Sequence, residues 1–138
     1  MQGFRFVYNE YGAPTSRITD ILFTDGEDGS AGEAVKIDAG RWTKAGATDE
    51  IGGFLSSNIE SGTDQPCEVF QAREGDVFEA AFTGTPDAGF VPGANEVAIA
   101  ADGLSVDAAT VTGGSIAVLG VIEDKKVCRI KVKKRQLS

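Results

Sequence analysis

The chain of 138 residues contains no histidine, and it has only two cysteines, four prolines, one tryptophan and one methionine. Without histidine a Ser–His–Asp triad is impossible, and the most versatile acid–base group and metal ligand is missing. Such chemistry would have to come from cysteine or from clustered carboxylates. We therefore expect a protein that binds or assembles, and not an enzyme.

The two cysteines predict no metal site, because neither Cys67 nor Cys128 has a second cysteine or a histidine nearby in sequence. Both lie within or beside apolar runs, which is typical of small buried residues. In a reducing compartment they are expected to be free thiols, and a single disulfide between them is the alternative.

Long apolar runs are absent as well. The sequence contains no run of 18 apolar residues, so it predicts no transmembrane helix. The opening sequence Met1-Gln-Gly-Phe-Arg-Phe-Val-Tyr8 lacks the apolar core and cleavage site of a signal peptide. Synthesis in a cytoplasm and no membrane partner are the expectations.

Acidic side chains and glycine are abundant. The 21 carboxylates outnumber the 13 basic residues, so the net charge is −8 and the pI is about 4.5. An acidic surface repels nucleic acid, so no nucleic-acid partner is expected. The 18 glycines and the slightly low hydrophobic content of 41% predict many turns and a thin core. Such a domain gains stability by associating with a partner or with its own copies.

Short apolar runs separated by glycine, aspartate or proline predict an all-β fold, a small β-barrel or sandwich with short turns and an extended N-terminal arm. The expected strands are 33–38, 41–45, 50–57, 67–72, 77–83, 96–100, 115–123 and 126–133. Asp38-Ala-Gly40 and Asp102-Gly103 have the composition of hairpin turns. Residues 107–112 receive no assignment, and no stretch has a helical period over 12 residues.

Residues 1–31 differ from the β-rich domain expected over 32–138. They hold Phe4, Phe6, Tyr8 and Tyr11, followed by a loop rich in glycine and aspartate. An aromatic strand outside the main core is a candidate for pairing with another chain, and we then expect deletion of 1–23 to leave the domain folded. The equally weighted alternative is that this segment is simply the first strand of the barrel.

The C-terminal segment has the clearest local pattern. Seven of the 13 basic residues lie in the last fourteen positions, and Arg129, Lys131 and Lys133 alternate with Cys128, Ile130 and Val132. Three interpretations remain: a solvated strand face, a docking strip for an acidic protein surface, and, least favoured, a nucleic-acid site. Trp42, between Arg41 and Lys44, is either a core residue or an interface residue.

The remaining motifs predict no metal, cofactor or catalytic residue. Counted from Asp25, the acidic loop has Ser30 at position six and Lys36 at position twelve, where an EF-hand needs glycine and glutamate. The pairs Gly52-Gly53 and Gly113-Gly114 lack the lysine of a phosphate-binding loop and are expected to be bulges or bends.

Several segments together resemble the capsid decoration (cement) proteins of tailed bacteriophages. They are Gly32-Glu-Ala-Val-Lys-Ile-Asp-Ala-Gly-Arg-Trp-Thr-Lys-Ala45, Glu50-Ile-Gly-Gly-Phe-Leu-Ser-Ser-Asn58, Gly75-Asp-Val-Phe-Glu-Ala-Ala-Phe82, Ile99-Ala-Ala-Asp-Gly-Leu104 and Gly120-Val-Ile-Glu123. The similarity lies in the order of these segments and in their residue patterns, over about residues 32–132.

This resemblance implies a small β-rich structural protein that acts as a homotrimer on the outer surface of the virion. It would sit at threefold or quasi-threefold sites of the expanded shell and bind the major capsid protein. The candidate contact residues for the capsid or a sister subunit are Phe4, Phe6, Tyr8, Tyr11, Trp42, Arg129, Lys131 and Lys133. The alternatives are another virion part, such as a head-fibre base or tail-tube protein, and a ligand-binding β-domain.

Overall fold

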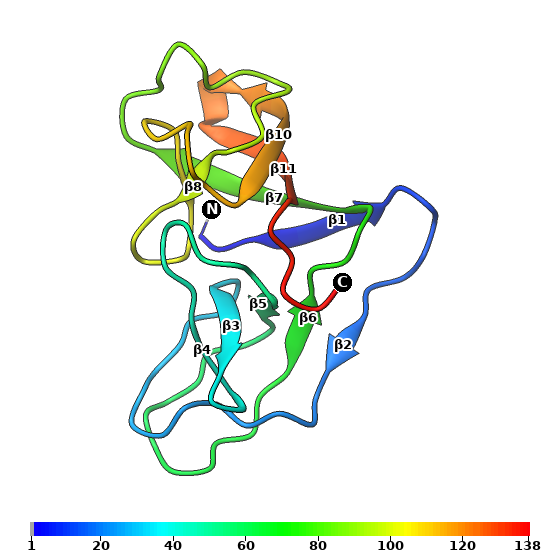
Figure 1. Ribbon diagram of the computed structural model, residues 1–138, viewed down its shortest axis with the longest axis vertical. Helices are drawn as coiled ribbons and strands as arrows, with labels where there is room; N and C mark the ends of the chain where they lie inside the picture. Colours follow the sequence, from blue (N-terminus) through cyan, green and yellow to red (C-terminus); the bar gives the residue numbers. More distant parts are fainter. Residues whose placement is uncertain (1) are drawn as a thin grey trace.

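The computed structural model describes residues 2–138, and it confirms the all-β fold as two sheets (Figure 1). The first sheet consists of β1 (Arg5–Asn9), β7 (Asp76–Thr83), β8 (Ala98–Ile99), β9 (Val106–Asp107), β10 (Ile116–Ile122) and β11 (Val127–Val132). The second sheet consists of β2 (Arg17–Ile18), β3 (Ala34–Asp38), β4 (Arg41–Lys44), β5 (Gly53–Leu55) and β6 (Val69–Gln71). In Figure 1 the first sheet occupies the upper part of the view and the second sheet the lower part.

Strand β7 is the centre of the first sheet. It pairs antiparallel with β11 on one side and with β1 on the other, and its end pairs parallel with β9. The strand order is β10-β11-β7-β9-β8, with β1 attached to β7. In the second sheet the order is β2-β6-β5-β3-β4. The chain therefore crosses between the sheets after β1 and again between β6 and β7.

The main core lies between the two sheets, and its centre is aromatic. Phe4 stacks on Phe54 with ring centroids 4.6 Å apart, and Phe54 packs at the same distance on Phe78. Apolar residues of β7, β10 and β11 complete this cluster. Such aromatic pairs stabilise a core beyond the area that they bury.

A second, smaller core lies on the other side of the second sheet. Successive residues of β3 and β5 alternate between the two cores, so that Ala34 and Phe54 belong to the main core while Val35 and Leu55 belong to the second. The second core also contains Trp42, which is completely buried. The second sheet is thus buried on both faces, and the sequences of its short strands did not predict this.

The N-terminal segment is integrated into this architecture and is not an arm outside the core. β1 pairs with β7 and Phe4 is 4% exposed, which agrees with the interpretation of this segment as a strand of the main sheet. Phe23 is completely buried in the second core and forms a parallel bridge with Trp42. Residues on both sides of position 31 therefore share the same cores.

The expected strands agree with the observed ones within a few residues, except that 50–57 and 96–100 shrink to Gly53–Leu55 and Ala98–Ile99. Two very short strands, β2 and β9, were not predicted as such. The glycine pairs serve close packing: a Cβ at Gly52 would lie 2.6 Å from the Trp42 ring, and one at Gly114 would collide with the backbone of Val97. These glycines let neighbouring segments approach closely.

Candidate interaction surface

The last strand directs its basic residues away from the main core. Cys128 and Ile130 of β11 are buried in that core, whereas Arg129 is exposed and Lys131 partly exposed. Side chains of directly paired residues project to the same side of a sheet. We use the term outer face for the side chains that the pairing directs away from the main core: Arg5, Tyr8, the completely buried Val77, Glu79, Ala81, Ala117, Ile122, Val127, Arg129 and Lys131.

A row of three charged residues crosses the middle of the outer face. The strand register places Glu79 of β7 opposite Arg5 of β1 on one side and opposite Arg129 of β11 on the other. Arg5 Nη2 lies 2.6 Å from Glu79 Oε1, and Arg129 Nε lies 3.5 Å from Glu79 Oε2. The Glu79 side chain is 15% exposed, while those of Arg5 and Arg129 are 69% and 48% exposed. Two accessible guanidinium groups thus share one shielded carboxylate.

A second ion pair and exposed apolar groups flank this row. Lys131 Nζ lies 2.6 Å from Glu10 Oε1, just beyond the end of β1. Tyr8 is 44% exposed and Ile122 is 48% exposed. Val127, partly buried, pairs with both Ile122 and Ala81. Charged and apolar groups in one open sheet face are typical of protein-binding surfaces.

Several of the residues selected from the sequence come together here. Tyr8, Arg129 and Lys131 lie on the outer face, and Lys133 is exposed directly after β11. Tyr11, 73% exposed, lies in the turn that follows β1.

Of the other three candidates, Phe4 and Trp42 lie in the interior, which corrects their selection as contact residues. Phe4 and Trp42 are buried in the main and second cores. Phe6 is half-buried and packs edge-on against Phe78, with ring centroids 5.9 Å apart. These residues were selected because they are aromatic, and the sequence did not reveal that the two sheets would enclose aromatic side chains.

Sequence reasoning also missed Arg5, Glu79 and Glu10. Arg5 and Glu79 are 74 positions apart, and only the register of β1 on β7 brings them together. The alternation Phe78, Glu79, Ala80 within a strand was the available signal that Glu79 points away from the core.

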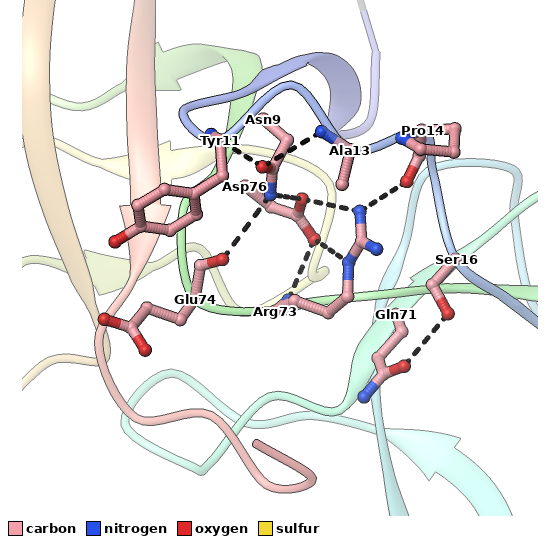
Figure 2. A network of polar contacts seen from close by, with 9 residues as sticks. All are labelled: Asn9, Tyr11, Ala13, Pro14, Ser16, Gln71, Arg73, Glu74 and Asp76. Carbon is pink, nitrogen blue, oxygen red and sulfur yellow. Dashed lines mark hydrogen bonds and ion pairs between the residues drawn. The ribbon is translucent and has the colours of Figure 1, made fainter.

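A buried polar network holds the end of β1 beside the start of β7 (Figure 2). Arg73 donates from Nε to Oδ2 of Asp76 and from Nη2 to Oδ1, both at 3.0 Å, and the Asp76 side chain is 1% exposed. Asn9 donates from Nδ2 to the same carboxylate at 2.8 Å. The Arg73 backbone N–H also donates to Oδ2, at 2.9 Å. Because four donors satisfy this carboxylate, its charge is compensated inside the protein.

The same network organises the loop between the sheets. Asn9 Oδ1 accepts hydrogen bonds from the backbone N–H groups of Tyr11 and Ala13, at 2.8 and 3.3 Å. Arg73 Nη2 donates to the carbonyl oxygen of Pro14 at 2.6 Å. Figure 2 shows the Asp76 carboxylate and the Pro14 carbonyl oxygen meeting the Arg73 guanidinium, while the Tyr11 and Ala13 N–H groups meet Asn9 Oδ1. The network ties the crossing 10–16 to the crossing 72–75 and so fixes one end of the outer face.

A groove of about 430 Å³ opens between the two sheets. Phe4, Phe6 and Phe70 contribute its aromatic lining, and Arg5 and Arg17 are its charged residues. Both arginines are already in ion pairs, Arg5 with Glu79 and Arg17 with Glu68. The Arg17 guanidinium also lies 5.2 Å from the centre of the Phe70 ring. The groove thus has apolar walls, and both of its charged side chains are already engaged; its other polar lining residues are Gln2, Thr15 and Ser56.

The carboxylate of Glu33 is buried inside the protein. It is 2% exposed, its Oε1 accepts from the Ser30 N–H at 3.0 Å, and its Oε2 has no hydrogen-bond partner within residues 2–138. Lys44 Nζ lies 3.8 Å from Glu33 Oε2. Burial raises the pKa of the Glu33 carboxyl, although the Ser30 hydrogen bond and Lys44 oppose that shift.

Both cysteines are free and buried, as predicted. Burial, with a smaller contribution from Glu79, raises the pKa of the Cys128 thiol to about 12, and burial also raises the pKa of the Cys67 thiol. In the part of the chain that the structure describes, no three cysteine or carboxylate groups are placed to hold a metal ion. The same residues contain no helix that is long and apolar enough to cross a membrane.

Comparisons with known protein families and with curated protein sequences found no match for this chain.

Proposed function

We propose that the chain is a structural virion protein that decorates the outer surface of an expanded phage capsid and stabilises the shell by bridging major capsid protein subunits. The segments that resemble decoration proteins fall on the β3–β4 hairpin, on β5, on β7 and on β10. The resemblance therefore concerns the framework of the fold and not its loops alone.

The observation that carries the proposal is the open outer face. It presents exposed charged and apolar side chains on β1, β7, β10 and β11, a rigid set of paired strands. A protein that binds through such a face has no need of a catalytic cluster. We assign the capsid contact to this face, which includes Arg5 and Tyr8 of β1, whereas Phe4 and Phe23 of the same N-terminal segment lie in the cores.

The proposed mechanism is stabilisation by binding. Contacts that exist only in the assembled shell favour the intact shell by mass action. As a homotrimer at threefold or quasi-threefold sites, the protein would engage several capsid subunits at once, so modest contacts at each subunit would add up to tight attachment.

Co-sedimentation with undecorated expanded capsids tests this function, and unexpanded shells are the control. We expect saturable binding to the expanded form only, at a copy number that fits its threefold sites. Absence of binding to both forms would contradict the proposal. Attachment of the protein to tails or fibres instead would identify it as another virion component.

A further inference from the structure

The charges of this chain are strongly separated along the sequence. Residues 1–124 contain all 21 acidic side chains and six of the basic ones, for a side-chain charge of −15. Residues 125–138 contain the other seven basic side chains and no acidic one, for a charge of +7. An acidic protein therefore carries one compact basic segment.

The fold places this segment along and beyond one side of the outer face. Arg129 and Lys131 lie on the face, and Lys133 follows them. Lys125 and Lys126 lie at the other end of β11, in and after the 3₁₀ turn Glu123–Lys125. Arg5 of β1 joins the same surface through Glu79. The basic surface thus extends over both ends of β11 and across β7.

Most of this positive charge is not compensated within the protein. Glu79 and Glu10 are the carboxylates that form ion pairs with these basic residues, and Glu79 is shared by two arginines. Exposed Glu123 and Asp124 precede Lys125 in the 3₁₀ turn. Within residues 2–138, no carboxylate lies within ion-pair distance of five basic residues: Lys125, Lys126, Lys133, Lys134 and Arg135. Exposed Lys125, Lys126 and Lys133 are therefore available to carboxylates of another molecule.

The composition of this surface favours a protein over a nucleic acid. Glu79 and Glu10 stand within the basic area, where they would repel a continuous phosphate backbone, and the remainder of the chain carries −15. Exposed Ile122 and partly buried Val127 lie beside the central row, where they can be desolvated by apolar side chains of a protein partner.

We propose that the outer face, together with Lys125, Lys126 and Lys133, is an electrostatic docking surface for an acidic patch on a protein partner. Partner carboxylates would pair with the accessible guanidinium groups of Arg5 and Arg129 and with the uncompensated lysines. This deepens the proposed function and rests on it for the identity of the partner, the capsid protein. Opposite charges of this kind accelerate association and make it sensitive to salt.

The first experiment does not depend on capsids. Poly-L-glutamate serves as the acidic polypeptide probe and is titrated into the purified chain at low salt, with detection by amide NMR. We expect shifts at Arg129, Lys131 and Lys133, and weakening by about fivefold or more in the double variant Arg129→Gln with Lys133→Gln. The matched control, Arg17→Gln with Lys36→Gln, removes the same two side-chain types from β2 and β3 and is expected to leave binding unchanged within about twofold. Thermal melts establish that both variants are folded.

Three results would overturn the proposal. The shifts are absent or fall elsewhere, the two double variants weaken binding equally, or a short DNA duplex competes more strongly than poly-L-glutamate at the same charge concentration.

The second experiment uses undecorated expanded capsids, with binding measured from about 50 to about 300 mM salt. We expect wild-type binding to weaken with salt and the outer-face variant to bind less than its control. Failure of the wild type to bind capsids, with the poly-L-glutamate result intact, would reject the proposed function and leave the docking surface standing. Equal capsid binding by both double variants would reject the docking surface alone.

Discussion

Asn9 at the end of β1 donates a hydrogen bond of 2.8 Å to Asp76 at the start of β7, although the two residues are 67 positions apart. Asp76 also accepts two hydrogen bonds from the Arg73 guanidinium. Through this relationship the two places where the chain crosses between the sheets are joined by one buried carboxylate.

Asp76→Asn is expected to destabilise the protein strongly. The amide loses the charge that compensates Arg73, and breaking a buried ion pair costs about 3–5 kcal/mol when one partner stays charged; the Arg73 side chain is 24% exposed, so we expect about 2–4 kcal/mol. Urea unfolding measures the difference. The control is Ser16→Ala, which removes one half-buried hydrogen bond to Gln71 and should cost less than about 1.5 kcal/mol. Equal effects of the two substitutions would contradict the central role of Asp76.

Ala39→Asn is expected to stabilise the β3–β4 hairpin. Ala39 and Gly40 form its two-residue loop with φ values of +51° and +82°, and alanine is strained in that region. Asparagine is favoured at the first position of a type I′ turn, so the gain should be about 0.5–1 kcal/mol. The melting temperature reports it. Gly40→Ala, the opposite change in the same turn, should lower the melting temperature, and a rise in its place would show that the turn is not strained.

Glu33→Gln is expected to stabilise the protein more at pH 7.5 than at pH 5. Burial raises the pKa of this carboxyl in the folded state, so folding favours its protonated form. The stability that it contributes is fully present below the unfolded-state pKa, near 4.5, and is lost as the pH rises through the folded-state pKa. A neutral amide avoids this loss, and relief of the buried charge should yield about 1–3 kcal/mol.

Unfolding free energies of wild type and Glu33→Gln at the two pH values test this linkage. The exposed residue Glu60 provides the control, and Glu60→Gln should shift stability little at either pH. A difference between wild type and Glu33→Gln that is the same at both pH values would rule out a titration effect of Glu33.

Deletion of residues 1–23 is expected to unfold the protein, contrary to the expectation from sequence. The deletion removes β1 and the buried side chains Phe4 and Phe23. Phe4→Ala alone should cost about 3–5 kcal/mol, because it leaves a cavity against Phe54. The matched control is Tyr11→Ala, which truncates an aromatic side chain that is 73% exposed and should change the unfolding free energy little. Circular dichroism of the truncated chain showing native sheet content would refute this prediction.

The strands could be predicted from the sequence because each combines β-forming residues with a turn signal. The C-terminal strand is the clearest case. Its apolar residues Cys128, Ile130 and Val132 alternate with the basic residues Arg129 and Lys131, and this alternation predicts both a strand and the side of it that is buried. The turn Asp38-Ala-Gly40 was equally informative.

The pairing of distant strands could not be predicted. Phe4 and Phe54, or Arg5 and Glu79, are brought together by contacts that no local pattern encodes. For this reason the aromatic N-terminal segment was open to two interpretations, and part of the candidate contact set turned out to be core. The basic half of the outer face could be predicted from the sequence, whereas the position of Glu79 between Arg5 and Arg129 could not.

The pairing of β1 with β7 has a consequence for how the protein is made. β1 leaves the ribosome before β7, and its partner residue Glu79 is synthesised 74 positions after Arg5, which takes roughly 4–15 seconds at about 5–20 residues per second. During this interval β1 has no partner strand, and Phe6 lacks Phe78, the ring against which it packs. The nascent chain therefore carries an unpaired aromatic strand until β7 has been synthesised.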